Sequence, residues 1–216
     1  MNREPLATGE HYHIYNRGVD KREIFPNEQY VDRFLLCMQV FNSIDPILSL
    51  RDAFEIRAED NLPNRQKLVE VVAYCLNPNH YHFILEQLVD GGIAEFMKRL
   101  NGGYTWYFNK RHARNGALLQ GAYKSSHVDE NERLLELSAY VNLNDKVHQI
   151  GGETAVVVRS SWGEYVDKDV GFCKKSLILD QFNDDGGYKK FALEALPTLL
   201  ERKKEEKELT TFLLEI

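Results

Sequence analysis

Two apolar runs, at residues 68–76 and 80–85, are separated by an Asn-Pro-Asn tripeptide at 77–79. Short runs rich in β-branched and aromatic residues favour strands. Asn-Pro between two such runs indicates a turn. The pattern therefore predicts a β-hairpin with His80 and His82 at the start of its second strand.

Other segments show helical or alternating spacing of apolar residues. Alternation over His11–Arg17 predicts a first strand that ends at Gly18. Apolar stripes predict helices at about 27–42, 92–112 and 129–144, the last with Asp129 as its N-cap. Residues 47–57 are ambiguous, 59–66 are expected to form a loop, and 116–126 a short extended segment.

The order of these elements favours an α+β fold. Strand, helix, strand, strand and helix in succession suggest a ferredoxin-like antiparallel sheet with helices on one face. Beyond residue 151 the pattern is looser, with candidate helices at 175–182 and 187–196 and a charged helical stretch at 201–208. We therefore expect a domain over residues 1–150 and a mostly helical C-terminal extension over 151–216.

Composition narrows the class of protein. The chain has 216 residues, of which 43% are hydrophobic and 28% charged, as in soluble globular proteins. No apolar stretch approaches 18 residues, and the N-terminus is polar, so neither a membrane span nor a signal peptide is expected. Three widely spaced cysteines without a CxxC motif indicate neither a disulfide framework nor a zinc ribbon. The expected setting is the cytoplasm.

The charge distribution is uneven. The net charge of −6 counts against nucleic-acid binding, because phosphate contacts require Lys and Arg. Residues 92–127, however, contain six cations and a single acid, Glu95. A basic middle on an acidic body is compatible with a nucleic-acid partner.

His80 and His82 carry the candidate metal chemistry. Alternate strand positions share a face, so both imidazoles project together while Tyr81 points the other way. Two imidazoles about 7 Å apart along a strand can bind one divalent ion. Tyr140 follows 58 positions after His82 (140 − 82), in the third predicted helix. A metal beside a tyrosine hydroxyl suits cleavage of a phosphodiester by covalent attack.

These residues also have a structural interpretation. A His-x-His pair often only packs, and Leu137 and Val141 flank Tyr140 as they would flank a core tyrosine. A second pair, His11 and His13, lacks the Pro-Asn turn and lies at a frayed strand end. We assign His13 to packing or substrate contact.

Several motifs in a fixed order carry a family resemblance. They are Tyr-His-Ile-Tyr-Asn-Arg-Gly at 12–18, Ile-Phe at 24–25, Asn-Pro-Asn-His-Tyr-His at 77–82, Met-Lys-Arg-Leu at 97–100, Tyr-Val-Asn-Leu-Asn at 140–144 and Ser-Ser-Trp-Gly-Glu-Tyr at 160–165. Together they resemble the single-domain HUH (His-hydrophobic-His) transposases, specifically the REP-associated tyrosine transposases. The resemblance covers roughly residues 11–165. Asn77, Ala122 and Asp145 depart from the family pattern, which has Met, Arg and Pro there; we expect Asn77 to be harmless in a turn.

The resemblance implies a reaction. A Mg²⁺ or Mn²⁺ ion held by His80 and His82 would polarise the scissile phosphate of single-stranded or hairpin DNA, and Tyr140 would attack it. The product is a 5′-phosphotyrosine and a free 3′-hydroxyl, and the reverse step gives strand transfer. Asn144 lies one helical turn after Tyr140 and is either a third metal ligand or the C-cap of the helix.

The remaining expectations concern DNA contacts and assembly. Seven cations are candidate phosphate contacts: Arg17, Lys21, Arg22, Arg99, Lys110, Arg111 and Lys124. Trp106 or Tyr107 is a candidate for stacking on a base, with core burial expected for at least one. We expect a monomer or weak homodimer, associated with the nucleoid when bound to DNA. The alternative function is a catalytically silent nucleic-acid-binding module with the same sheet.

Overall fold

The structure is a computed structural model that describes residues 6–46, 65–152, 157–167, 169–184 and 186–214. The ambiguous segment at 47–57 and most of the expected loop at 59–66 lie outside these residues. Among the residues described, no helix combines the length and apolarity needed to cross a lipid bilayer.

A five-stranded sheet forms the centre of the fold. Its strands are β1 (His11–Arg17), β2 (Val69–Asn77), β3 (His80–Gln87), β4 (Lys124–Val128) and β5 (Arg159–Ser160). They lie in the order β4-β1-β3-β2-β5, and neighbouring strands are antiparallel. The order β4-β1-β3-β2, with helices after β1 and β3, is ferredoxin-like. The α+β class, the first strand and the hairpin are confirmed, whereas only the end of the segment at 116–126 is a strand.

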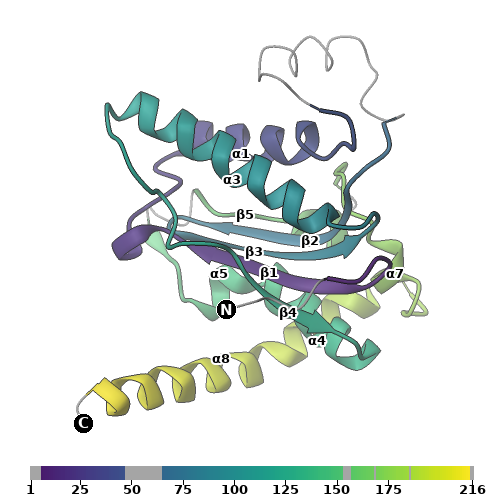
Figure 1. Cartoon of the computed structure of the whole chain (residues 1–216). Coiled ribbons are helices and arrows are strands. Elements are labelled where there is room, and N and C mark those ends of the chain that lie inside the picture. The colour runs from purple at the N-terminus through teal and green to yellow at the C-terminus, as the bar shows by residue number, and fades with distance from the viewer. Residues whose placement is uncertain (1–5, 47–64, 153–156, 168, 185, 215–216) are drawn as a thin grey trace.

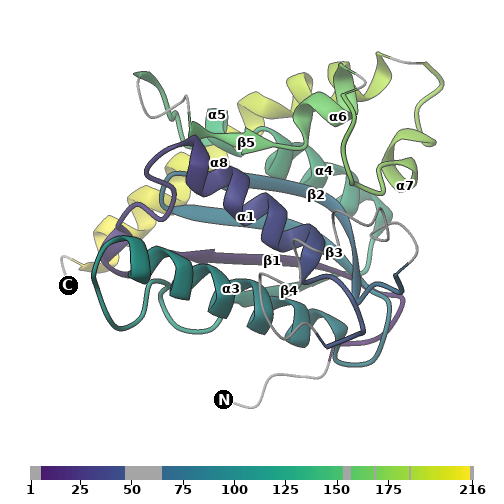
Figure 2. The ribbon, with the colours of Figure 1, turned by 90° about the horizontal axis from the view of Figure 1, so that it is seen from above.

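Helices cover both faces of the sheet (Figures 1 and 2). On one face lie α1 (Glu28–Val40) and α3 (Gly92–Arg111). On the other lie α4 (Asn131–Asn142), α5 (Asn144–Val147) and α8 (Gly187–Leu214). The prediction of helices on one face was wrong in this respect. The reason is visible in β2 and β3, which are buried at nearly every position instead of at alternate ones.

The two layers between helices and sheet have different chemistry. Under α1 and α3 the core is aromatic and includes Phe34, Tyr81, Phe83 and Tyr104. The opposite layer is smaller and more aliphatic, with Ile84 from β3 against Val141 from α4. His80 and His82 lie on the side of this second layer, since Tyr81 between them enters the first.

The N-termini of α1 and α4 differ in how they are capped. Asn27 caps α1, its side-chain oxygen accepting a hydrogen bond from the Gln29 backbone N–H. The prediction that Asp129 caps α4 was wrong, because Glu130 occupies the N-cap position. The Asp129 carboxylate lies 3.9 Å from the Arg133 guanidinium instead.

The C-terminal part joins the sheet and the second layer. β5 pairs with the end of β2, and Tyr188 of α8 is buried in the second layer. Between them lie the short helices α6 (Trp162–Val166) and α7 (Ser176–Leu179). α8 is one helix that continues through Pro197, where the sequence predicted an end near 196. The division of the chain at residue 150 stays a prediction.

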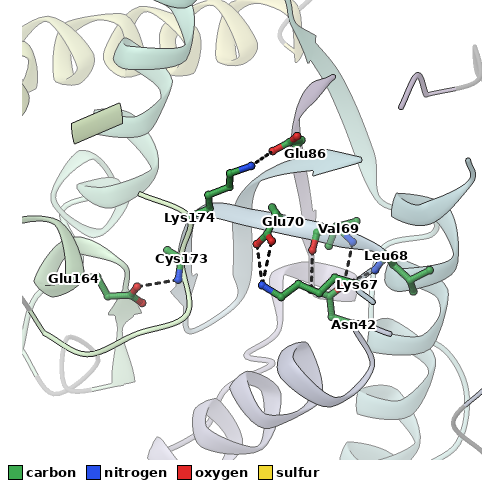
Figure 3. A network of polar contacts seen from close by, with 9 residues as sticks. All are labelled: Asn42, Lys67, Leu68, Val69, Glu70, Glu86, Glu164, Cys173 and Lys174. Atoms are coloured by element: carbon green, nitrogen blue, oxygen red, sulfur yellow. Dashed lines mark hydrogen bonds and ion pairs between the residues drawn. The ribbon is translucent and has the colours of Figure 1, made fainter. Parts of the chain in front are cut away.

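Polar contacts from Asn42 and from Lys174 in the C-terminal part reach the hairpin of β2 and β3 (Figure 3). The Asn42 side chain accepts hydrogen bonds from the backbone N–H groups of Leu68 and Val69 and donates one to the Val69 carbonyl. Lys174 pairs with Glu86 on β3 at 3.1 Å. The hairpin that carries the two histidines is thus held by Asn42, just after the end of α1, and by Lys174 of the C-terminal part.

Candidate active site

His80 and His82 project together from the start of β3. Their ring centroids are 5.3 Å apart and the ring planes are nearly perpendicular. Both side chains are buried. The period of the strand and the Pro-Asn turn before it place the pair where β1, β3 and α4 meet.

The hydrogen bonds of His80 select one tautomer. Its Nδ1 lies 2.6 Å from the Asn79 side-chain oxygen, which can only accept, so Nδ1 carries the proton. Nε2 keeps its lone pair and faces the Asn77 amide group at 2.9 Å. Asn77 is the last residue of β2 and is fully buried. Asn77 therefore lies on a strand and not in a turn as expected, and the expectation that it is harmless in place of Met stays a prediction.

A third histidine, His148, completes a cluster. The ring centroids of His80 and His148 are 4.6 Å apart. One ligand atom from each of His80, His82 and His148 lies within 4.8 Å of the others, so this group could hold a metal ion. The sequence analysis missed His148, a single histidine just after a short helix. Its spacing of four from Asn144 (148 − 144) is the only local signal.

Asn144 lies at the edge of this cluster. It is the first residue of α5 and is fully buried. Its side-chain oxygen is 2.6 Å from the Asn77 Nδ2 and 3.2 Å from the His80 Nε2. The alternative that Asn144 caps the preceding helix was wrong, because Leu143 occupies that position. Its role as a metal ligand stays a prediction.

Burial keeps the histidine pair neutral. Burial, followed by the neighbouring His148, lowers the pKa of His80 to about 3. Burial also lowers the pKa of His82 well below its usual 6.5, with His13 as the next contribution. Metal ligation requires the unprotonated imidazole, so both side chains are available at neutral pH.

Tyr140 approaches the pair from α4. Its ring meets His82 edge-on, with centroids 5.6 Å apart, and meets His13 edge-on at 6.1 Å. The side chain is partly buried against the second layer and also lines the cavity described below. Tyr140 is therefore neither a fully buried core residue nor a solvent-exposed one.

The structure brings His13 into the same cluster and leaves His11 out of it. The Nε2 of His13 lies 2.9 Å from the Nδ1 of His82. Burial lowers the pKa of His13 to about 4. His11 lies 3.8 Å from Glu86, near the other end of β1. The two members of this second pair thus have different surroundings.

One cavity of about 760 Å³ is bordered by His13, His80, His82, Tyr140 and His148. Among the described residues that line it, none is acidic. Three cations face it, Arg17 from β1, Lys124 from β4 and Lys203 from α8. The cavity therefore combines uncharged imidazoles with a cationic wall, although the chain as a whole has a net charge of −6.

The seven cations predicted to contact phosphate lie in different parts of the fold. Arg17 and Lys124 line the cavity, and Lys21 and Arg22 follow β1 around a short 3₁₀ turn, η1 (Val19–Lys21). The other three are on α3, across the sheet. Arg99 binds Glu95 and the Ser43 carbonyl, which gives it a structural role.

The basic end of α3 also carries the two aromatic candidates. Trp106 is 58% exposed, with the Lys110 ammonium 4.8 Å from its ring centroid. Tyr107 packs on the first core and on Tyr30, and Arg111 lies over its ring. Core burial was expected for at least one of the two, and Tyr107 is only partly buried against the core, whereas Trp106 is exposed.

Comparison with known proteins gives a family. A family model described as "Transposase IS200 like" matches residues 61–168, half of the 216 residues. One similar solved structure is described as "Structure of the REP associates tyrosine transposase bound to a REP hairpin". It shares 11% identity and has a TM-score of 0.46, covering 78% of this chain and 85% of its own. No curated protein matches the chain. On the match to the family model, the chain belongs to the IS200-like transposase family.

Proposed function

We propose that this transposase cleaves and rejoins single-stranded or hairpin DNA through a covalent bond between Tyr140 and a 5′-phosphate. The observation that carries the proposal is the convergence of His80, His82 and Tyr140 on one cavity, with no acid among the described residues that line it. A phosphodiester is an anion, and the positively charged side chains that line the cavity favour its binding.

The donor set fits a divalent ion. His80 and His82 would hold it, and His148 and Asn144 offer further donors at the same place. When bound, Mg²⁺ or Mn²⁺ supplies Lewis-acid polarisation of the scissile phosphate. Imidazole ligands favour Mn²⁺ in affinity.

Neighbouring side chains orient the two imidazoles. The Asn79 side-chain oxygen accepts the Nδ1 proton of His80, so Nε2 has the lone pair that would ligate the ion in place of its contact with the Asn77 amide group. His82 reaches the same state when its Nδ1 donates to the His13 Nε2 at 2.9 Å. His13 therefore acts as a positioning residue for His82 in this proposal.

Tyr140 provides the nucleophile. A bond forms between its phenolic oxygen and phosphorus, and the bond from phosphorus to the 3′-oxygen breaks. The phenolic proton is lost to solvent, and the departing 3′-oxygen takes up a proton. Attack by a 3′-hydroxyl on the phosphotyrosine reverses these steps and rejoins a strand without ATP.

The proposed site lies within one chain. The rings of His82 and Tyr140 are 5.6 Å apart in the same protomer, so a second copy is not needed to bring them together. This supports a catalytic monomer. Mixing His82→Ala protein with Tyr140→Phe protein tests it: restored activity would mean that two chains share a site.

The decisive experiment detects the covalent adduct. Single-stranded DNA labelled downstream of the cleavage site is incubated with protein and Mn²⁺, resolved on a denaturing gel, and the attached peptide is mapped. Of the 11 tyrosines, only Tyr15 and Tyr140 line the described cavity, so Tyr15→Phe is the matched control. We expect an adduct in the wild type and in Tyr15→Phe, and none in Tyr140→Phe. DNA binding without any adduct would indicate a silent binding module.

A further inference from the structure

An apolar stripe attaches α8 to the rest of the protein. Tyr188 and Ala192 are fully buried, Leu196 is partly buried, and Leu199 is 9% exposed. The spacing of three and four residues puts Ala192, Leu196 and Leu199 on one face of the helix. Asn142 of α4 donates a 2.8 Å hydrogen bond to the Tyr188 hydroxyl. This face of α8 therefore packs on α4.

The next position on the same face is Lys203, four residues after Leu199 (203 − 199). A continuous packing stripe would have an apolar residue there. Lys203 instead borders the cavity that also contains His80, His82 and Tyr140, and it is half-buried. The helix thus directs a cation toward the proposed site.

We propose that Lys203 binds the scissile phosphate, so that α8 contributes part of the DNA-binding surface. This inference rests on the proposed function, and it adds a substrate contact from the C-terminal part of the chain.

The surrounding charges support this assignment. Arg17 and Lys124 reach the cavity from the strands, whereas Lys203 reaches it from the helical side.

One acidic side chain near this part of α8 pairs with Arg202. Glu136 of α4 lines the adjoining cavity of about 290 Å³ and lies 3.2 Å from the Arg202 guanidinium. Because no acidic residue is among the described residues that line the larger cavity, an anion entering it meets only neutral or positive side chains.

The test separates a phosphate contact from a packing role. Binding is measured in the Tyr140→Phe background, which cannot cleave, with and without Lys203→Ala. One oligonucleotide carries the normal scissile phosphate and the other a neutral methylphosphonate at that position. Lys204→Ala is the matched control, since Lys204 is the adjacent and exposed residue of α8.

We expect Lys203→Ala to weaken binding of the charged oligonucleotide about tenfold and to leave binding of the methylphosphonate unchanged. The log–log salt slope should lose about 0.7. Lys203→Arg should restore most of the affinity, and Lys204→Ala should have little effect on either oligonucleotide.

Three results would overturn the inference. They are equal weakening on both oligonucleotides, no weakening on either, or faster adduct formation by Lys203→Ala, which would mean that the side chain obstructs the site. The adduct assay on the wild-type protein tests the proposed function separately from the role of Lys203. Absence of a wild-type adduct refutes the cleavage mechanism, whereas the binding comparison still decides the role of Lys203.

Discussion

His148 provides the sharpest test of the proposed metal centre, because the structure alone brings it there. We predict that His148→Ala weakens Mn²⁺ binding by about tenfold to a hundredfold. Its ligand atom lies within 4.8 Å of those of His80 and His82, so its removal takes one of three imidazoles from the cluster. A tenfold loss of affinity corresponds to about 1.4 kcal/mol.

The effect on stability follows from mass action. A ligand at one hundred times its dissociation constant stabilises the folded state by about 2.7 kcal/mol. If the affinity falls a hundredfold, the same Mn²⁺ concentration stabilises the variant by only about 0.4 kcal/mol. The metal-free variant should lose little stability, because His148 is half-buried at the end of the short helix α5.

Two measurements check this prediction. Calorimetric titration gives the Mn²⁺ affinity, and thermal unfolding with and without Mn²⁺ gives the stabilisation. His127→Ala is the control, since it also removes one of the seven histidines but from an exposed pair with Glu10. It should bind Mn²⁺ as the wild type does.

Unchanged Mn²⁺ affinity in His148→Ala would refute the reasoning. In that case His80 and His82 would be left with Asn144 as the third ligand, and Asn144→Ala should then show the loss. If neither variant weakens binding, the cluster is not the metal site.

Three further predictions concern stability and DNA binding. Asn42→Ala should lower the free energy of unfolding in urea by about 2–4 kcal/mol, because three hydrogen bonds to the backbone of Leu68 and Val69 are lost; an unchanged midpoint would contradict this. With a chelator present, stability should fall as the pH drops from about 6.5 toward 4, since the unfolded chain takes up a proton that buried His13 excludes. His13→Gln should make that fall shallower in thermal melts. Affinity for single-stranded DNA should fall with salt with a log–log slope of about −2 to −4, and a flat response would count against phosphate binding.

The local pattern of residue types in the sequence determined the strands that position His80 and His82. Alternation placed β1 at His11–Arg17, and the Pro-Asn turn separated β2 from β3. The period of a strand then required His80 and His82 to share a face. These features depend on residues close together in the chain, which is why the sequence predicts them.

The resemblance to a known family identified a candidate nucleophile that hydrophobic spacing did not. Hydrophobic spacing alone would have classed Tyr140 with the core residues of its helix, and the family motif singled it out. The structure then places it edge-on to His82 beside the cavity.

Only the tertiary structure decided which distant residues share the site. His13 meets His82 across 69 positions of the chain, and Asn77 meets Asn144 across 67. His148 and Lys203 carry no motif of their own; His148 reaches the cavity through the packing of α5 on the sheet, and Lys203 through the packing of α8 on α4. Such contacts depend on strand order and on helices covering both faces. Strand and helix periods, which relate only near neighbours along the chain, leave these contacts undetermined.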